Sequence, residues 1–320
     1  MERSFEKSLC LGTGIPFVLL LCLISVPNAI VLIALYRNPL RCFRKAFSVF
    51  LVFIAAMDLY IGIVVCSGEA AMRFLCAFGD KQIPQEGDIP RILGYIGINS
   101  SILLVTAMSV DRFVSVICPH FYLREVKPRK LILCNTIIVV FSSIFASLQL
   151  TGISIDIYLL IDIHLHTTFP LVTTTLAYLG IFVALKKRSR VDLQRQSITA
   201  RNSRLRNMRQ LKIAQMERKF ATTSFFILLF LILSLVPYFV AVIIEANCSI
   251  CRGQKWLFVL KESSVIFLFL NSTVNPLLTI FRINGLKHSV KIVLRLRRQN
   301  DVNSFGSFLP PTSLANVVSN

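Results

Sequence analysis

Seven long apolar segments, separated by short polar connectors, dominate this chain of 320 residues. Each is about 20 residues long or longer, which is the length that an α-helix needs to cross the hydrocarbon core of a bilayer. Backbone polar groups cannot stay unpaired in lipid, so segments of this kind span the membrane as helices. The sequence therefore predicts an all-α membrane protein, a bundle of seven transmembrane helices near 14–36, 46–68, 89–118, 131–151, 167–185, 220–244 and 256–281.

The basic residues are distributed unevenly along the chain. The formal net charge is +19, which on a soluble domain would indicate a nucleic-acid partner. Here Lys and Arg cluster after the first, third, fifth and seventh segments. The positive-inside rule explains this clustering without nucleic acid. It predicts a multi-pass membrane protein with residues 1–13 on the outer side and the C-terminal tail in the cytoplasm.

The ends of the chain differ in character. The first apolar segment is too long for the core of a signal peptide and is not followed by a small-residue cleavage site, so we expect it to remain as a helix. Residues 282–298 alternate apolar and basic positions at helical spacing, which predicts an amphipathic helix on the inner leaflet. Residues 299–320 are rich in Ser and Pro and are expected to be disordered.

Two of the nine cysteines lie in a polar connector between the sixth and seventh segments. These are Cys248 and Cys251, and we expect them to form a disulfide. Half of a zinc site is the alternative, but no second Cys or His pair accompanies them, so no metal site is predicted. Asn247, in the pattern Asn-Cys-Ser, is a candidate glycosylation site on the outer side.

Polar residues are rare inside the apolar segments, and several of them fall at one depth. Counting residues from the segment ends places them near mid-bilayer on four helices. Interhelical hydrogen bonding is the simple explanation. An ionisable carboxylate among them favours a hydrated ion site instead, since an isolated charge is costly there. The set is Asn28, Asp58, Ser101, Asn271 and Asn275.

An Asp-Arg pair lies at the inner end of the third segment. A bare arginine at the edge of the membrane is costly unless it reaches water or an acid. Asp111 is the nearest partner of Arg112, and Glu217, at the inner edge of the sixth segment, is a second candidate. Pro237 and Pro276 remove helical hydrogen bonds and predict kinks in the sixth and seventh helices.

Taken in order, these motifs resemble the rhodopsin-like (class A) G-protein-coupled receptors over nearly the whole chain. The matching residues are Asn28, Ala55-Ala56-Met57-Asp58, Asp111-Arg112-Phe113 with Pro119 and Tyr122, Pro170, Tyr178, Glu217, Pro237, and Asn271-Ser272-Thr273-Val274-Asn275-Pro276 followed by Phe281-Arg282. The outer Cys248 to Cys251 motif and the stretch 256–282 are most similar to the adenosine and melanocortin branch.

The resemblance implies a multi-pass receptor of the plasma membrane that passes a ligand signal to a heterotrimeric G protein by outward movement of the sixth helix. Arrestin and a receptor kinase are implied as partners of the tail. The implied activation switch is Asp111, Arg112, Tyr178, Glu217, Asn275 and Pro276. The implied allosteric sodium site, the one cofactor that the resemblance suggests, comprises Asp58, Ser101, Asn271, Ser272 and Asn275, with Asn28 beside it.

Several family features are missing. No Cys stands at the outer start of the third segment or in the 152–166 connector, so the usual disulfide between them is absent. Leu235 occupies the place of an aromatic residue in the sixth helix, and Thr279 replaces a tyrosine in the seventh. A receptor that binds ligand without activating G proteins is therefore the alternative. A transporter is less favoured because no repeat is present, and no catalytic motif indicates an enzyme.

The outer halves of the third, sixth and seventh helices are expected to hold the ligand. Gly94 stands where amine receptors carry an Asp, and Val242 where adenosine receptors carry an Asn, which argues against both ligand classes. Glu69, Glu245 and Glu262 are expected at the outer rim, mostly solvated. The prediction is an apolar or amphipathic ligand or a peptide with a basic group, in a pocket of Gly94, Tyr95, Ile98, Leu235, Tyr238, Phe239, Val242, Val265 and Phe269.

Overall fold

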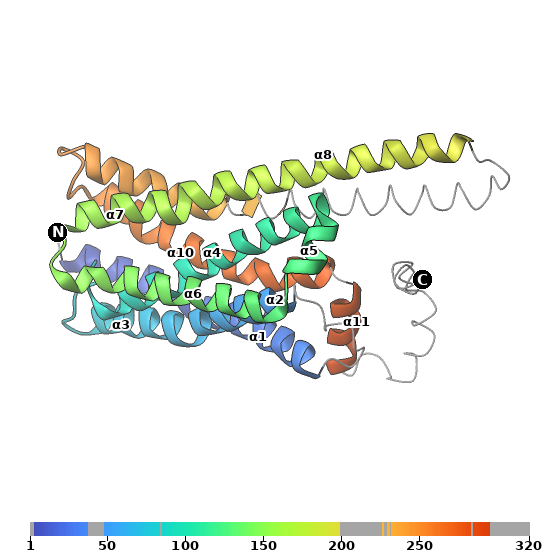
Figure 1. Cartoon of the computed structure of the whole chain (residues 1–320). Coiled ribbons are helices and arrows are strands. Elements are labelled where there is room, and N and C mark those ends of the chain that lie inside the picture. Colours follow the sequence, from blue (N-terminus) through green and yellow to red (C-terminus); the bar gives the residue numbers. More distant parts are fainter. Residues whose placement is uncertain are drawn as a thin grey trace.

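The structure, a computed structural model, describes residues 3–37, 48–83, 85–198, 226, 229–230, 232–282 and 284–294. Within these residues the protein is helical and contains no strand. The long helices run roughly along one common axis, whereas the short helix α11 (Asn284–Val293) lies across one end of the bundle (Figure 1). Following the predicted orientation, this end is termed the inner end and the opposite end the outer end.

The elements follow the apolar pattern of the sequence closely. The bounds are α1 Arg3–Arg37, α2 Ser48–Tyr60, η1 Ile61–Cys66, α3 Ser67–Phe78, α4 Ile89–Ile117, α5 Pro119–Glu125, α6 Pro128–Ser147, η2 Leu148–Thr151, α7 Ile155–Ile163, η3 His164–Thr168, α8 Phe169–Ile198, α10 Lys255–Arg282 and α11 Asn284–Val293. A further apolar helix is described over Ile232–Asn247.

Six of the described helices are long and apolar enough to cross a membrane, and Ile232–Asn247 is a shorter apolar one. The continuous runs α2–η1–α3 and α7–η3–α8 each count as one of these spans. Many large apolar side chains point outward, among them Leu19, Leu133 and Leu176. In water such a surface would be unfavourable, whereas lipid solvates it. The prediction of a seven-helix transmembrane bundle is therefore confirmed.

The first helix begins earlier than the sequence suggested. We expected residues 1–13 to precede it, but α1 already starts at Arg3. Glu6 lies in its first turn, where an acidic side chain offsets the helix dipole. The outer part of α1 packs on α3, and a disulfide from Cys10 to Cys76 joins the two helices. Contacts with α3 therefore accompany the helix through residues 3–13. The composition of these residues is too polar for the sequence to predict a membrane span there.

The fifth span also starts before its predicted position. The stretch 152–166 was expected to be a connector, but α7 begins at Ile155 and continues through η3 into α8. Asp162 and His166 made this stretch look polar, yet both side chains are buried. Because their polar groups pair with each other inside the bundle, the helix can begin about three turns further out.

The core consists of two main clusters stacked along the bundle axis. The outer cluster includes Phe17, Ile61, Tyr158 and Phe269. The inner cluster joins α1, α2, α4 and α6. Leu286 of α11 also belongs to the inner cluster, so the apolar face of this amphipathic helix is packed on the bundle. Residues 295–320, which include the end of the predicted amphipathic helix and the whole predicted tail 299–320, lie outside the described residues.

Two π-helical turns, η1 and η3, interrupt the second and fifth spans. Such turns hold one extra residue and recur near functional sites. Next to η1, a Cβ atom on Gly97 would lie 2.6 Å from Ile61 Cγ1. The absence of a side chain at Gly97 therefore allows α4 to approach η1 closely. Both π turns lie in the outer half of the bundle, where the largest polar clusters are found.

Candidate functional site

The inner end of α4 carries a three-residue clasp formed by Asp111, Arg112 and Tyr122. Arg112 Nε donates to Asp111 Oδ2 at 3.0 Å, and a second guanidinium nitrogen also contacts that oxygen. The Tyr122 hydroxyl donates to Asp111 Oδ1 at 2.9 Å and lies 3.1 Å from Arg112 Nη2. The Asp111 side chain is buried, while 23% of Arg112 remains exposed. The guanidinium is thus held but still open to the inner side.

Local sequence places Tyr122 at this clasp. Pro119 occupies the first turn of α5, where the missing N–H costs nothing, so the chain turns and starts a new helix directly after α4. Burial raises the pKa of the Tyr122 phenol to about 12. The hydroxyl therefore keeps its proton at physiological pH and can donate to Asp111. Tyr122 belonged to the motif noted in the sequence, but its contact with the Asp-Arg pair was not anticipated.

The other predicted switch residues lie in different surroundings. Tyr178 of α8 is buried, and its hydroxyl accepts a hydrogen bond from Ser109 of α4 at 3.3 Å. Pro276 lies within α10, which continues through it. Glu217 lies outside the described residues, so its expected pairing with Arg112 stays a prediction.

At mid-depth, Asp58 of α2 is fully buried and bonded by two other helices. Ser101 of α4 donates to Asp58 Oδ1 at 2.7 Å, and Asn275 of α10 donates to Asp58 Oδ2 at 2.9 Å. The Ser272 side chain is also hydrogen-bonded to this carboxylate. The structure therefore brings together Asp58, Ser101, Ser272 and Asn275.

The two further members of the predicted network, Asn28 and Asn271, have other surroundings in the described structure. Asn28 is buried and donates to the carbonyl oxygen of Ser272 at 3.3 Å, which ties α1 to α10. Asn271 lies one turn before Asn275 on α10 and is partly buried. The contacts described for Asp58 thus come from Ser101, Ser272 and Asn275, and the roles of Asn28 and Asn271 in an ion site stay predictions.

Nearer the outer end, a cavity lies between α4, η3, Ile232–Asn247 and α10. Its apolar wall includes Ile102 and Leu268 in addition to predicted residues. Seven of the predicted pocket residues line it, and these are Gly94, Tyr95, Ile98, Leu235, Tyr238, Val265 and Phe269. Phe239 packs against the outer core cluster, and Val242 lines a separate smaller pocket. A mostly apolar lining with a few polar and charged groups is typical of small-ligand sites.

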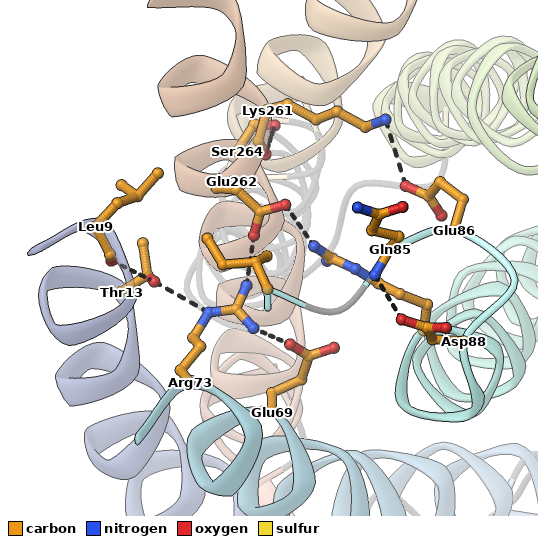
Figure 2. Close-up of polar contacts among 12 residues, drawn as sticks. Leu9, Thr13, Glu69, Arg73, Gln85, Glu86, Asp88, Lys261, Glu262 and Ser264 are labelled. Atoms are coloured by element: carbon orange, nitrogen blue, oxygen red, sulfur yellow. Dashed lines mark hydrogen bonds and ion pairs between the residues drawn. The ribbon is translucent and has the colours of Figure 1, made fainter. Parts of the chain in front are cut away.

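A buried ion network, drawn in Figure 2, lies beside this cavity, and two of its members, Glu69 and Arg91, line it. Arg73 of α3 is fully buried and contacts Glu69 of the same helix. It also donates to Glu262 of α10 at 2.6 Å and to Thr13 of α1 at 3.0 Å. Arg91 of α4 pairs with the other oxygen of Glu262. Four charged side chains from three helices therefore form one alternating chain.

This network overturns the expectation that Glu69 and Glu262 are solvated at the rim. Both are buried, and each is paired with arginine. The ion network could not be predicted from the sequence. Arg73 and Arg91 lie near the ends of apolar segments, where a basic side chain is ordinarily exposed. Glu245, the third predicted rim acid, pairs with Lys261 at 2.8 Å. A ligand group can reach the oxygens of Glu69 or Glu262 only in competition with arginine.

A tyrosine pair bridges the cavity. The hydroxyl groups of Tyr95 and Tyr238 lie 2.6 Å apart, and Tyr95 donates to Glu86 at 3.0 Å. Lys261 of α10 lies 3.4 Å from Glu86. The helix Ile232–Asn247 is thus connected through Tyr238 to the charged outer wall.

A second polar cluster, which the sequence did not suggest, lines the part of the cavity formed by α4, α7 and η3. Asp162 of α7 accepts a hydrogen bond from Asn99 of α4 at 2.8 Å and pairs with His166 of η3 at 2.9 Å. All three side chains are buried and line the cavity. The i,i+4 spacing of Asp162 and His166 was the available indication, but it lay in a stretch interpreted as a loop.

Two disulfides lie at the outer end. The predicted bond between Cys248 and Cys251 is present, next to the exposed Asn247. The bond from Cys10 to Cys76 was not predicted, since neither residue lies in the connectors where the family disulfide was sought. In the described part of the chain, no group of three or more His, Cys, Asp or Glu side chains is arranged to hold a metal ion.

Comparisons with known proteins agree with this architecture. The family model of the seven-transmembrane receptors (rhodopsin family) matches residues 27–158 and 154–278. A comparison with curated proteins gives no significant match. The family match does not distinguish the adenosine or melanocortin branch, and the proteins of this family are receptors rather than enzymes. The match covers most of the chain and includes the Asp58 and Arg112 clusters, so the chain belongs to the rhodopsin family of seven-transmembrane receptors.

Proposed function

We propose that this receptor binds a ligand from the outer side and activates a heterotrimeric G protein at its inner end. The observation that carries the proposal is the clasp at Arg112. A partly exposed guanidinium at the inner edge of α4, restrained by Asp111 and Tyr122, is suited to bind a partner once released. Charge-assisted bonds of an arginine can be exchanged between an internal acid and carbonyl groups of a docking protein.

The cavity supplies a route from ligand to clasp. Leu235 and Tyr238 line it, and they flank Pro237 on the helix Ile232–Asn247. A ligand that repositions these two side chains acts at the point where the helix lacks a backbone hydrogen bond. The inner half of this helix would then swing outward and open a binding surface around Arg112. The ligand stabilises this open state by its higher affinity for it.

The buried carboxylate of Asp58 is the proposed sodium site. The Ser101 hydroxyl and the Asn275 side-chain amide already lie within hydrogen-bond distance of this carboxylate. A sodium ion there would neutralise a charge that is otherwise costly in the middle of the membrane. Sodium would bind the resting state and oppose the agonist by linkage.

The same proposal places the protein in the plasma membrane with the basic connectors inside. The connector 186–219 and the tail carry the positive charge expected of surfaces that meet anionic lipid. The Ser-containing tail 299–320 is the proposed substrate of a receptor kinase and the docking segment of arrestin.

Nucleotide exchange tests the proposed coupling directly. The full chain is reconstituted in lipid nanodiscs, and GTPγS uptake is measured with purified heterotrimers of each major G-protein class. We expect uptake above empty nanodiscs with at least one class, and its loss in Arg112→Ala. Arg124→Ala is the matched control, because Arg124 is exposed on the same inner surface and outside the clasp. Equal uptake by the Arg112 and Arg124 variants, or none above background for any class, would contradict coupling.

A further inference from the structure

The pair formed by Asp162 and His166 has an unused hydrogen-bonding position in the wall of the cavity. Asp162 is 5% exposed and His166 is 2% exposed, and both line the cavity. Asp162 Oδ1 already accepts from Asn99 Nδ2 at 2.8 Å and meets His166 Nδ1 at 2.9 Å. Among the described residues, His166 Nε2 is buried without any hydrogen-bond partner.

The tautomer of His166 follows from its neighbour. An ionised carboxylate can only accept hydrogen bonds, so Nδ1 must carry the hydrogen that it shares with Asp162. In a neutral imidazole Nε2 then carries a lone pair and acts as an acceptor. Buried polar atoms are nearly always paired in folded proteins. An unpaired acceptor beside a buried carboxylate therefore indicates a hydrogen-bond donor that the described part of the chain does not provide.

The charge balance of the wall gives the sign of that donor. Glu69 and Glu262 are matched by arginines, and Glu86 lies beside Lys261. In contrast, the partners of Asp162 in the described structure are an amide and an imidazole. A buried carboxylate without a permanent cation is costly unless a cation joins it. The deep wall of the cavity is thus acidic and rich in acceptors.

We propose that Asp162 and His166 bind a protonated amino group of the ligand. The remainder of the ligand packs on the apolar wall made by Ile98, Leu235 and Phe269. The absence of an acid at Gly94 argued against an amine, but that argument considered α4 alone. Here the carboxylate comes from α7, a helix that the sequence did not reveal at this position. The inference deepens the proposed receptor function by naming the ligand class of the same cavity.

Three small probes that share one ring test the assignment. Purified full-length protein in lipid nanodiscs is titrated with 2-phenylethylamine, with its neutral analogue 2-phenylethanol, and with the anionic 3-phenylpropionic acid. Affinity is obtained from the rise of the unfolding temperature with probe concentration. We expect the amine to bind at least about tenfold more tightly than either analogue, as a charge-assisted bond in a buried site would give. No G protein is present, so failure of coupling would leave this result unaffected.

Variants locate the effect. Asp162→Asn should weaken amine binding by roughly 10- to 100-fold and abolish the preference over the alcohol. His166→Phe removes the Nε2 acceptor while keeping a ring beside Phe145, and a loss of about three- to tenfold is expected. The matched control is Asp156→Asn, since Asp156 is an exposed acid on the same helix and outside this cavity. It should bind the amine like the unmodified chain.

Several outcomes would overturn the inference. Tightest binding of the acid would mean that His166 is the charged partner and the ligand an anion. Equal binding of the amine and the alcohol by the unmodified chain, or no binding of the amine, would contradict the role of Asp162. This result does not depend on whether the Asp162 variant folds. An amine preference that persists in both the Asp162 and His166 variants would place the cation elsewhere in the cavity.

Discussion

Tyr122 donates a hydrogen bond to Asp111 at 2.9 Å and so joins α5 to the end of α4. The same hydroxyl lies 3.1 Å from Arg112. One phenol therefore stabilises both members of the ion pair that restrains the inner end of the receptor. This relationship makes Tyr122 a part of the proposed resting state, although it carries no charge.

Replacing Tyr122 with Phe should raise basal G-protein activation. A lost hydrogen bond to an ion pair weakens the resting state by about 1 kcal/mol, which corresponds to roughly a fivefold shift between two states. Basal GTPγS uptake at equal receptor density is the measurement. Tyr36→Phe is a suitable control because Tyr36 is 92% exposed at the inner end of α1. Unchanged basal uptake in Tyr122→Phe would show that the hydroxyl does not restrain the clasp.

Glu217→Ala should also raise basal activation if Glu217 holds Arg112 at rest. A partly shielded ion pair contributes only about 1 kcal/mol, which still changes a two-state population several-fold. Basal uptake at equal surface expression measures this. Combining Glu217→Ala with Tyr122→Phe shows whether the two residues act on the same arginine, since coupled residues give non-additive effects. Wild-type basal uptake in the single Glu217 variant would rule out the pairing.

Asp58→Asn should make ligand binding independent of sodium. If sodium binds at Asp58 in the resting state, raising sodium lowers the affinity of an activating ligand by linkage. The variant keeps a side chain that can bond Ser101 but lacks the charge that attracts the ion. Ligand affinity is compared in sodium and in N-methylglucamine chloride at equal ionic strength. The site would be disproved by a sodium effect of the same size in the variant.

Glu262→Gln should destabilise the protein strongly. Arg73 and Arg91 both pair with Glu262, and loss of the charge leaves two buried guanidinium groups with fewer anions. Breaking a buried pair costs on the order of 3–5 kcal/mol. At about 2–4 °C per kcal/mol, the unfolding temperature should fall by roughly 6–20 °C. Asp80→Asn breaks an exposed pair with Arg3 and should change the unfolding temperature by about 4 °C at most. Similar small shifts in both variants would contradict a structural role for the network.

The disulfide from Cys10 to Cys76 should contribute more stability than the disulfide from Cys248 to Cys251. The first closes a loop with a sequence separation of 66, the second one of 3. Longer loops lose more entropy in the unfolded chain when they are closed, and a contribution of about 2–4 kcal/mol is typical. Thermal unfolding of the two double Cys→Ser variants compares them. A larger loss in the Cys248/Cys251 variant would reverse this ranking.

The sequence was informative wherever one local rule decided the outcome. The lengths of the apolar segments located all seven helices, because a segment in lipid must pair its own backbone hydrogen-bonding groups and an α-helix does so. Counting along helices at 1.5 Å per residue brought Asp58, Ser101 and Asn275 to one depth, and the structure joins them. The same counting placed Gly94, Tyr95 and Ile98 on the wall of the cavity.

The sequence was uninformative where side chains from distant parts of the chain pair with each other and so offset the free-energy cost of burying a charge. Arg73 and Glu262 look like ordinary surface charges, and only their pairing makes burial favourable. Asp162 and His166 lowered the apolarity of 152–166, so a helix was interpreted as a loop. The early start of α1 was missed for a related reason, since its outer turns depend on the disulfide to Cys76.

The buried pairing of Arg73 with Glu262 also has a consequence for biosynthesis. The two residues are 189 positions apart, and α10 is the last membrane span to leave the ribosome. Until then Arg73 has Glu69 as its neighbour on the same helix, and the second carboxylate is missing. The outer half of the early helices therefore cannot reach its final packing before translation of the last span is complete. Truncated chains that end before 262 would carry an incompletely neutralised arginine, a feature by which membrane quality control can distinguish them from the finished receptor.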